Sequence, residues 1–270
     1  MKRLSIVLIA LCFLSMPVLA FSGELSETFM LPKESSVVRY VDKKSGDLRS
    51  EVSSVVTREE RDGKTIYVGK MKGKGSFDEF ENCTWTVEGK MEERDGFLWP
   101  IYTLRTYYDA DGKQIASFRK DFDYKKKRVY IVSTDENGKE RKKALPIKGK
   151  TIDNFTMIYF LKTYMAHRGD KKYKQYYYVS DEPKLYNMKL LDSGTEEFEL
   201  PSGEKVQALK TNIYIDMGLL TGLTKMMIPP TFVWYTPDSP YVWLQYEGLE
   251  TSLGSPHIIA TIVERDPPIK

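Results

Sequence analysis

The sequence predicts a mainly β protein: a single antiparallel curved sheet, a half-barrel or barrel, with one apolar helix that covers or plugs its concave face. Aromatic and β-branched residues recur in short runs, and turn pairs such as Asp62-Gly63 and Asn137-Gly138 separate them. Many short strands joined by tight hairpins are typical of an antiparallel sandwich or barrel. A strongly apolar segment with helical features, after residue 150, supplies the covering element.

The expected strands follow one another from residue 37 onward. Residues 97–108 carry large apolar side chains on both faces, which predicts that a helix or a bound ligand covers the second face. Within residues 206–215 the alternation of apolar and polar residues is interrupted at Ala208 and Leu209, two consecutive apolar residues, which predicts a bulge. The glycine-rich stretch 69–76 lacks phosphate-loop spacing and is expected to be a strand running into a turn. In chain order, the expected strands are residues 37–41, 52–57, 65–71, 84–91, 97–108, 114–122, 128–133, 173–179, 186–191, 206–215, 232–235, 241–246 and 258–264, with Ser193-Gly194 among the turns.

A helix is expected between Thr151 and Gly169. Thr151 is the expected N-cap, Asp153 lies in the first turn where the helix dipole favours an acid, and Gly169 is placed to end the helix. The apolar residues between them point almost all round a helix, which predicts burial on most sides. These residues are Ile152, Phe155, Met157, Ile158, Tyr159, Phe160, Leu161, Tyr164 and Met165.

The first twenty residues predict a secretory signal peptide. Lys2 and Arg3 precede the apolar run 4–14, which is shorter than the roughly 20 residues that span a bilayer. Small residues precede the expected cleavage point after Ala20. The mature chain would then start at Phe21 and act in the periplasm or outside the cell.

The rest of the chain is expected to be one domain. Residues 21–34 form a flexible leading segment and residues 35–270 a single β-barrel-like domain. The neighbours of Cys12 do not fit a lipobox, so the protein is not expected to be a lipoprotein. No later stretch has 18 consecutive apolar residues, so no second membrane span is expected.

Charge and cysteine content narrow the possible partners. Without Lys2 and Arg3 the chain is close to neutral, which argues against a nucleic-acid partner. Cys83 is the one cysteine of the expected mature chain, so it has no partner for an internal disulfide. It is expected to be a small buried apolar residue, with a reactive or intermolecular thiol as the alternative.

Catalytic motifs are missing from the sequence. The histidines are His167 and His257, expected near a helix C-terminus and at the start of the last strand, and neither belongs to a metal-binding motif. No serine-hydrolase elbow is present. We therefore expect no enzyme, no metal and no cofactor. Acidic pairs on one strand face could resemble a glycosidase pair, but they are more often a solvated surface: Asp121 with Asp123, and Glu197 with Glu199.

Two surface features leave alternatives open. A basic concentration over residues 125–150 is expected at solvated hairpin ends, or in contact with anionic lipid head groups or cell-wall polymers. Tyrosines within residues 173–178 are expected to form cross-strand pairs, or a surface on which sugars stack.

The helix region and the strands after it resemble a known family. The pattern runs from Leu145-Pro146 through Thr151-Ile-Asp153 and the aromatic helix to Gly169-Asp170, and continues with residues 198–206, 233–238 and 246–248. Over residues 35 to 265 it resembles a secreted bacterial family of unknown function. That family is similar in architecture to lipoprotein-localisation (Lol-type) carriers, half-barrels whose concave apolar face is covered by a helix. The resemblance implies a periplasmic single domain and a hydrophobic ligand, but no site residues, and fold alone does not give function.

These observations favour a non-enzymatic binding or carrier protein for a lipid or acyl ligand. The candidate ligand-binding residues are Phe155, Tyr159, Leu161 and Met165 of the expected helix. An apolar tip would dock on a membrane surface or envelope protein through Leu219, Leu220, Leu223, Met226 and Met227. The alternative is a structural or assembly factor of the cell envelope with a packed interior, which binds a protein or polysaccharide.

Overall fold

The computed structural model describes residues 30–77, 79–168, 170, 174–216, 229–251 and 254–269. These residues form strands that account for most of the chain, together with the helix α1, Asn154–Ala166. The strands are β1 (Lys33–Asp42), β2 (Leu48–Arg61), β3 (Lys64–Phe77), β4 (Phe80–Arg94), β5 (Phe97–Tyr108), β6 (Gln114–Asp123), β7 (Arg128–Thr134), β8 (Glu140–Pro146), β9 (Thr151–Asp153), β10 (Gln175–Val179), β11 (Leu185–Glu199), β12 (Lys205–Asp216), β13 (Thr231–Tyr235), β14 (Trp243–Leu249) and β15 (His257–Asp266).

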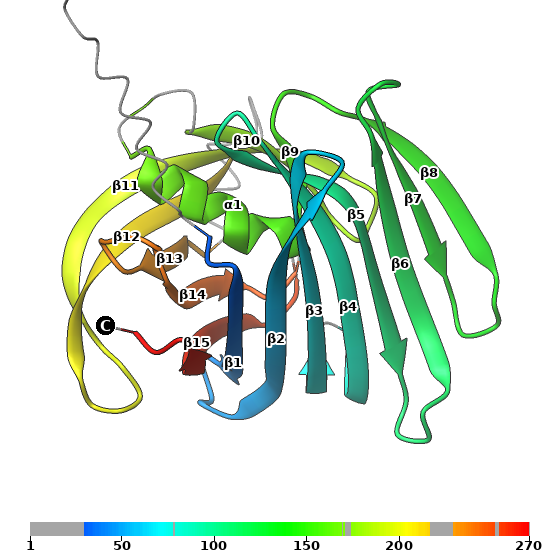
Figure 1. Ribbon diagram of the computed structural model, residues 1–270. Helices are drawn as coiled ribbons and strands as arrows, with labels where there is room; N and C mark the ends of the chain where they lie inside the picture. Colours follow the sequence, from blue (N-terminus) through cyan, green and yellow to red (C-terminus); the bar gives the residue numbers. More distant parts are fainter. Residues whose placement is uncertain are drawn as a thin grey trace, which may run out of the picture.

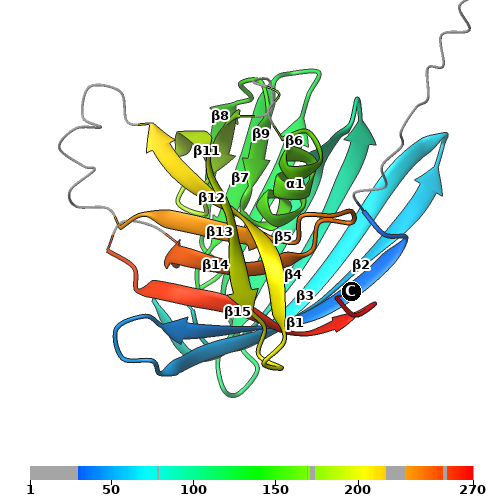
Figure 2. The ribbon, with the colours of Figure 1, turned by 90° about the vertical axis from the view of Figure 1, so that its left-hand side faces the viewer.

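All the strands belong to one curved sheet, in the order β8-β7-β6-β5-β4-β3-β2-β1-β15-β14-β13-β12-β11-β10-β9. Neighbouring strands are antiparallel except β9 and β10, which are parallel. Figure 1 and Figure 2 both show the sheet curling around α1. The predicted mainly β fold, with one curved sheet and an apolar helix on its concave face, is confirmed for the described residues.

Tight hairpins explain much of this order. Asp62 and Gly63 both have positive φ, at 52° and 71°, and join β2 to β3. Asp95 and Gly96 join β4 to β5 in the same way. Two consecutive residues with positive φ match the right-handed twist of a hairpin, and Asp-Gly adopts this conformation readily. The expected hairpin turns at these two places are therefore confirmed.

Two strands are missing from the sequence-based assignment. β8 has the sequence ERKKALP and is mostly exposed at one edge of the sheet, where charged side chains discourage pairing with another chain. β9 is three residues long and forms the other edge. Neither strand shows the aromatic and β-branched alternation on which the assignment relied.

The helix begins later than expected. Thr151 is not the N-cap, because it lies in β9 and its hydroxyl bonds the backbone of Lys148. Asp153 is the N-cap, and its Oδ1 accepts hydrogen bonds from the backbone N–H of Thr156 at 2.9 Å and from the Thr156 hydroxyl at 2.8 Å. The expected end at Gly169 lies outside the described residues.

α1 is buried on most sides, as its apolar periphery predicts. Phe160 stacks on Phe97 of β5 and lies against Tyr176 of β10. The Ile158 carbonyl accepts a hydrogen bond of 2.7 Å from the Tyr235 hydroxyl of β13. The sheet therefore holds the helix from opposite sides of its curve, as a plug (Figure 1). Among the described residues, no helix has the length and apolar character that a bilayer crossing requires.

Two boundaries differ from the sequence-based expectation. β1 includes residues 33 and 34, so ordered structure begins before residue 35. Ser193-Gly194 is not a turn, because both residues lie inside β11, where they form a bulge opposite Lys210 of β12. The predicted interruption in β12 is confirmed, since Ala208 and Leu209 are both buried, but the extra residues belong to β11.

Candidate functional site

A cavity of about 230 Å³ lies between the first turns of α1 and the concave face of the sheet. We call it the main cavity. Its wall combines strands from both halves of the sheet, β1–β5 and β10–β15. Glu182, in the turn between β10 and β11, lines the cavity and is exposed, so the cavity reaches the surface there. Most of the lining is apolar, including Val52, Trp85, Val87, Met188, Ile213, Val233, Trp243 and Ala260.

One stripe of α1 faces this cavity. Asn154, Met157, Ile158 and Leu161 line it, together with Phe155. Positions three and four apart share a face of a helix, so the first four of these side chains form one continuous strip. The helix therefore provides one wall of the main cavity along two turns.

A second cavity of about 70 Å³ adjoins the main cavity. We call it the side cavity. Tyr40, Val52, Met71, Ile158 and Trp243 line both spaces. These five side chains therefore form a wall that is common to both cavities.

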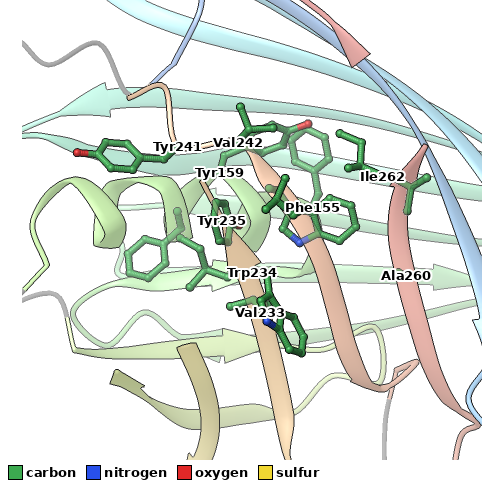
Figure 3. Packing of buried hydrophobic residues seen from close by; sticks show 14 of the residues in the cluster. Phe155, Tyr159, Val233, Trp234, Tyr235, Tyr241, Val242, Ala260 and Ile262 are labelled. Carbon is green, nitrogen blue, oxygen red and sulfur yellow. The ribbon is translucent and has the colours of Figure 1, made fainter. Parts of the chain in front are cut away.

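The structure distributes the four candidate ligand residues over three places. Phe155 and Leu161 line the main cavity, and Tyr159 lines the side cavity. Met165 is buried but lines neither cavity, and its sulfur lies 4.0 Å from the Thr211 hydroxyl. Figure 3 shows Phe155 and Tyr159 within the same apolar cluster as Tyr235 and Val242. The expected tip residues Leu219, Leu220, Leu223, Met226 and Met227 lie outside the described residues.

Paired glycines let Phe155 approach the sheet. Gly69 of β3 and Gly89 of β4 lie opposite each other in register. A Cβ atom at Gly69 would lie 2.5 Å from the Phe155 ring, and one at Gly89 would lie 2.4 Å from it. Only residues without a side chain fit beneath this ring. The stretch 69–76 is therefore a strand, as predicted, and its first glycine serves helix packing.

The same arrangement occurs beneath Trp85. A Cβ atom at Gly73 would lie 2.0 Å from the Trp85 indole, which belongs to the residue opposite it on β4. The indole therefore lies flat against β3 and contributes to the floor of the main cavity.

Five polar side chains form the Arg105 cluster, at the edge of the main cavity. The members are Arg105, Tyr107, Lys120, Asn154 and Asp181. Arg105 Nη1 donates to Asp181 Oδ2 at 3.0 Å and to the Tyr107 hydroxyl at 3.2 Å. Lys120 Nζ donates to Asp181 Oδ1 at 2.6 Å and to Asn154 Oδ1 at 3.3 Å, and Asn154 Nδ2 donates to Asp181 Oδ2 at 3.1 Å. The cluster joins α1 to β5, β6 and the β10–β11 turn.

The charges of this cluster make the free energy of unfolding depend on pH in the acidic range. Burial alone would raise the pKa of Asp181, but Lys120 and Arg105 hold it at about 2. An unfolded aspartate has a pKa of about 3.9. Asp181 therefore contributes stability of about 2 kcal/mol above pH 4, which is lost as the pH falls toward 2.

We expect Asp181→Asn to abolish this contribution. Its free energy of unfolding should fall below that of the wild type at pH 6, and the difference should shrink between pH 4 and pH 2. Urea titrations at several pH values would measure this difference in the free energy of unfolding. Asp121→Asn removes an exposed partner of Arg119 and serves as the control. An equal acid dependence in wild type and Asp181→Asn would contradict the prediction.

A second buried ionic group, the Glu34 cluster, fixes the middle of α1. Lys162 Nζ lies 2.7 and 2.8 Å from the two carboxylate oxygens of Glu34, and Arg265 Nη2 lies 3.0 Å from Glu34 Oε2. All three side chains are at least 90% buried. The cluster links α1 to β1 and β15 beside the side cavity.

A third ionic group, the pair of Arg49 and Glu250, borders the main cavity. Arg49 donates from Nε and Nη2 to the two oxygens of Glu250, at 3.2 and 3.0 Å. Glu250 lines the cavity and its side chain is fully buried. A guanidinium that meets a carboxylate with two parallel hydrogen bonds neutralises it efficiently.

The other residues that the sequence analysis singled out have structural roles. Cys83 is buried and free, as predicted, and burial raises the pKa of its thiol, which disfavours the reactive thiolate. His167 is the C-cap of α1, and His257 begins β15. Tyr176 packs beneath α1, whereas Tyr178 lines the main cavity. In the part of the chain that the structure describes, no group of His, Cys, Asp or Glu side chains could hold a metal ion.

Sequence reasoning missed the charged part of the site. Arg105 and Asp181 are 76 residues apart, and no motif connects them. Asn154, Met157 and Ile158 could have been found, since they share the helical stripe of Leu161. Glycines at positions 69 and 73 within a strand were also a usable signal, because interior strand glycines often mark a close approach.

Comparisons with known proteins give a family and a similar fold. A family model described as protein of unknown function (DUF3108) matches residues 38–260, a range that includes every residue lining the main cavity. A crystal structure of a beta-barrel-like protein of domain of unknown function DUF1849 from Brucella abortus is similar, with 12% identity and a TM-score of 0.47. The alignment covers 87% of this chain and 98% of that chain. Comparison with curated protein sequences gave no match.

Proposed function

The chain belongs to the DUF3108 family, whose function is unknown, and from the site itself we propose that it binds a hydrophobic ligand, a lipid or acyl species, in the main cavity. The proposed role is binding or carriage rather than catalysis. It keeps the envelope location that the leading residues predict.

The size and lining of the main cavity support this proposal. A dry apolar cavity of about 150 Å³ is enough to bind benzene. The main cavity measures about 230 Å³, and aromatic and aliphatic side chains dominate its wall. Ligand pockets typically combine such a lining with a few placed polar groups. The Arg105 cluster supplies polar groups of this kind.

The helix plug gives a physical basis for capture. Phe155 and Leu161 of α1 line the cavity together with Val233 and Ala260 of the sheet. Each Å² of apolar surface that leaves water contributes about 25 cal/mol, so an acyl chain gains stability in proportion to the length that enters. Release would require contact with another apolar environment, such as a membrane surface or an envelope protein.

A cavity-filling substitution tests the proposal. Ile215 is half-buried at the end of β12 and lines the main cavity, whereas its neighbour Tyr214 does not. We expect Ile215→Trp to lower the affinity for the neutral apolar dye N-phenyl-1-naphthylamine by about tenfold or more, because the indole takes the space of the ligand. Dye fluorescence during titration measures this affinity.

Tyr214→Trp is the matched control and should bind the dye like the wild type. Native mass spectrometry and lipid extraction of the purified protein should identify what it carries. If the wild type takes up no dye and no lipid, the alternative of an envelope assembly factor with a packed interior replaces this proposal.

A further inference from the structure

We propose that the ligand of the main cavity is an amphiphile whose anionic head, a carboxylate or a phosphate monoester, binds Arg105. This inference rests on the proposed function and specifies the chemistry of the ligand. Its basis is a buried guanidinium that lines an apolar cavity and keeps a free donor.

Arg105 has unused hydrogen-bonding capacity. Its two hydrogen bonds, to Asp181 and Tyr107, both come from Nη1. Nε is buried and has no partner among the residues that the structure describes. The side chain is 10% exposed and lies over the Phe77 ring, at 5.1 Å from its centroid. A buried donor without a partner is unfavourable, and an acceptor on a ligand would satisfy it.

The charge balance at this end of the cavity also favours an anion. One carboxylate, Asp181, lies between two cations, Arg105 and Lys120. The cluster therefore carries one excess positive charge. α1 begins at Asn154, inside the same cluster, but the buried carboxylate of its N-cap, Asp153, offsets the positive end of its dipole, so the excess charge rests on Arg105 and Lys120.

The other acidic residues of the wall do not cancel this excess. Glu250 is neutralised by Arg49 through two hydrogen bonds. Glu182 is exposed at the surface and pairs with Lys184. An anionic head at Arg105 would thus meet the excess positive charge of the Arg105 cluster, while its tail lies against Trp85, Phe155 and Leu161.

A headgroup series on one tail tests the inference. Decanoate, decyl phosphate, 1-decanol and decyltrimethylammonium would compete with N-phenyl-1-naphthylamine for the wild-type protein at pH 7. We expect both anions to bind at least about tenfold more tightly than decanol, equivalent to about 1.4 kcal/mol, and the cation to bind most weakly. The order of decanoate and decyl phosphate distinguishes a carboxylate ligand from a phosphate ligand.

Substitutions then assign the preference to Arg105. Arg105→Gln should remove the advantage of the anions over decanol, and Arg105→Lys should keep part of it, because the charge stays while the planar fork is lost. Arg119→Gln is the control, since Arg119 is exposed and meets Asp121 through two hydrogen bonds. Its headgroup preference should equal that of the wild type.

The outcomes separate this inference from the proposed function. If decanol binds the wild type as tightly as the anions, the headgroup assignment is wrong while the apolar-ligand proposal stands. If neither the dye nor any amphiphile binds, both are wrong. The wild-type series decides the headgroup preference even if Arg105→Gln does not fold.

Discussion

Replacing Glu34 by glutamine is expected to lower the free energy of unfolding by about 3–5 kcal/mol. The substitution removes the carboxylate that faces Lys162 at 2.7 Å and Arg265 at 3.0 Å, and leaves two cations buried side by side. Burial already lowers the pKa of Lys162 even though Glu34 opposes this effect. Without Glu34 the charged form of Lys162 has lost its main stabilising partner.

Urea unfolding at pH 7, followed by tryptophan fluorescence, would measure this loss. Glu51→Gln is a matched control on the neighbouring strand, because Glu51 and Arg39 form an exposed ion pair at 3.0 Å. Such pairs contribute about 0–1 kcal/mol. A loss for Glu34→Gln no larger than that of the control would show that the Glu34 cluster does not hold α1.

The pH dependence gives a second check of the same cluster. A lysine whose folded pKa lies below its unfolded value destabilises the fold most at low pH, and stability rises as the pH approaches the unfolded pKa of about 10.4. The deficit of Glu34→Gln should therefore be smaller at pH 9.5 than at pH 7. The double variant Glu34→Gln/Lys162→Met should recover part of the stability at pH 7.

Local chemistry made the fold class predictable. Asp62-Gly63 and Asp95-Gly96 specify tight turns by themselves, whatever the strands pair with later. The all-round apolar helix also had to be enclosed, because no surface could leave so many aromatic side chains in contact with water. The tight turns therefore predict the antiparallel sheet, and the apolar surface of α1 predicts its position inside that sheet.

The residue at which the helix begins is decided by a competition between strand pairing and helix capping, which the sequence alone does not reveal. Thr151 and Asp153 are both good capping residues. Thr151 pairs with Tyr177 of β10 in a parallel strand contact, which takes it out of the helix and leaves the cap to Asp153. That contact joins segments separated by the whole of α1, so local propensity alone cannot predict it.

The site was predictable only on its helical side. Phe155 and Leu161 follow from the apolar pattern of one segment. Arg105 and Asp181 lie on segments that meet only when the sheet curls, and each looks like an ordinary surface charge in its own segment. Met165 shows the opposite error, because an apolar residue of the correct helix packs against Thr211 beyond the cavity.

The paired glycines beneath Phe155 lead to a second large effect. We expect Gly89→Ala to lower the free energy of unfolding by about 3 kcal/mol, at the upper end of typical overpacking losses. The new methyl group would lie 2.4 Å from the Phe155 ring, which has Gly69 beneath it and Tyr159 beside it. The ring is buried and has little room to move, so α1 itself would have to shift away from β4.

A double-mutant cycle isolates this contact. In a Phe155→Leu background the smaller side chain leaves room for the methyl group, so Gly89→Ala should cost clearly less than in the wild type. Lys70→Ala, an exposed position next to Gly69, is the control and should change stability by about 0.5 kcal/mol or less. Because Phe155 also lines the main cavity, Gly89→Ala should weaken binding of N-phenyl-1-naphthylamine. If Gly89→Ala costs as much in the Phe155→Leu background as in the wild type, the ring is not what requires a glycine there.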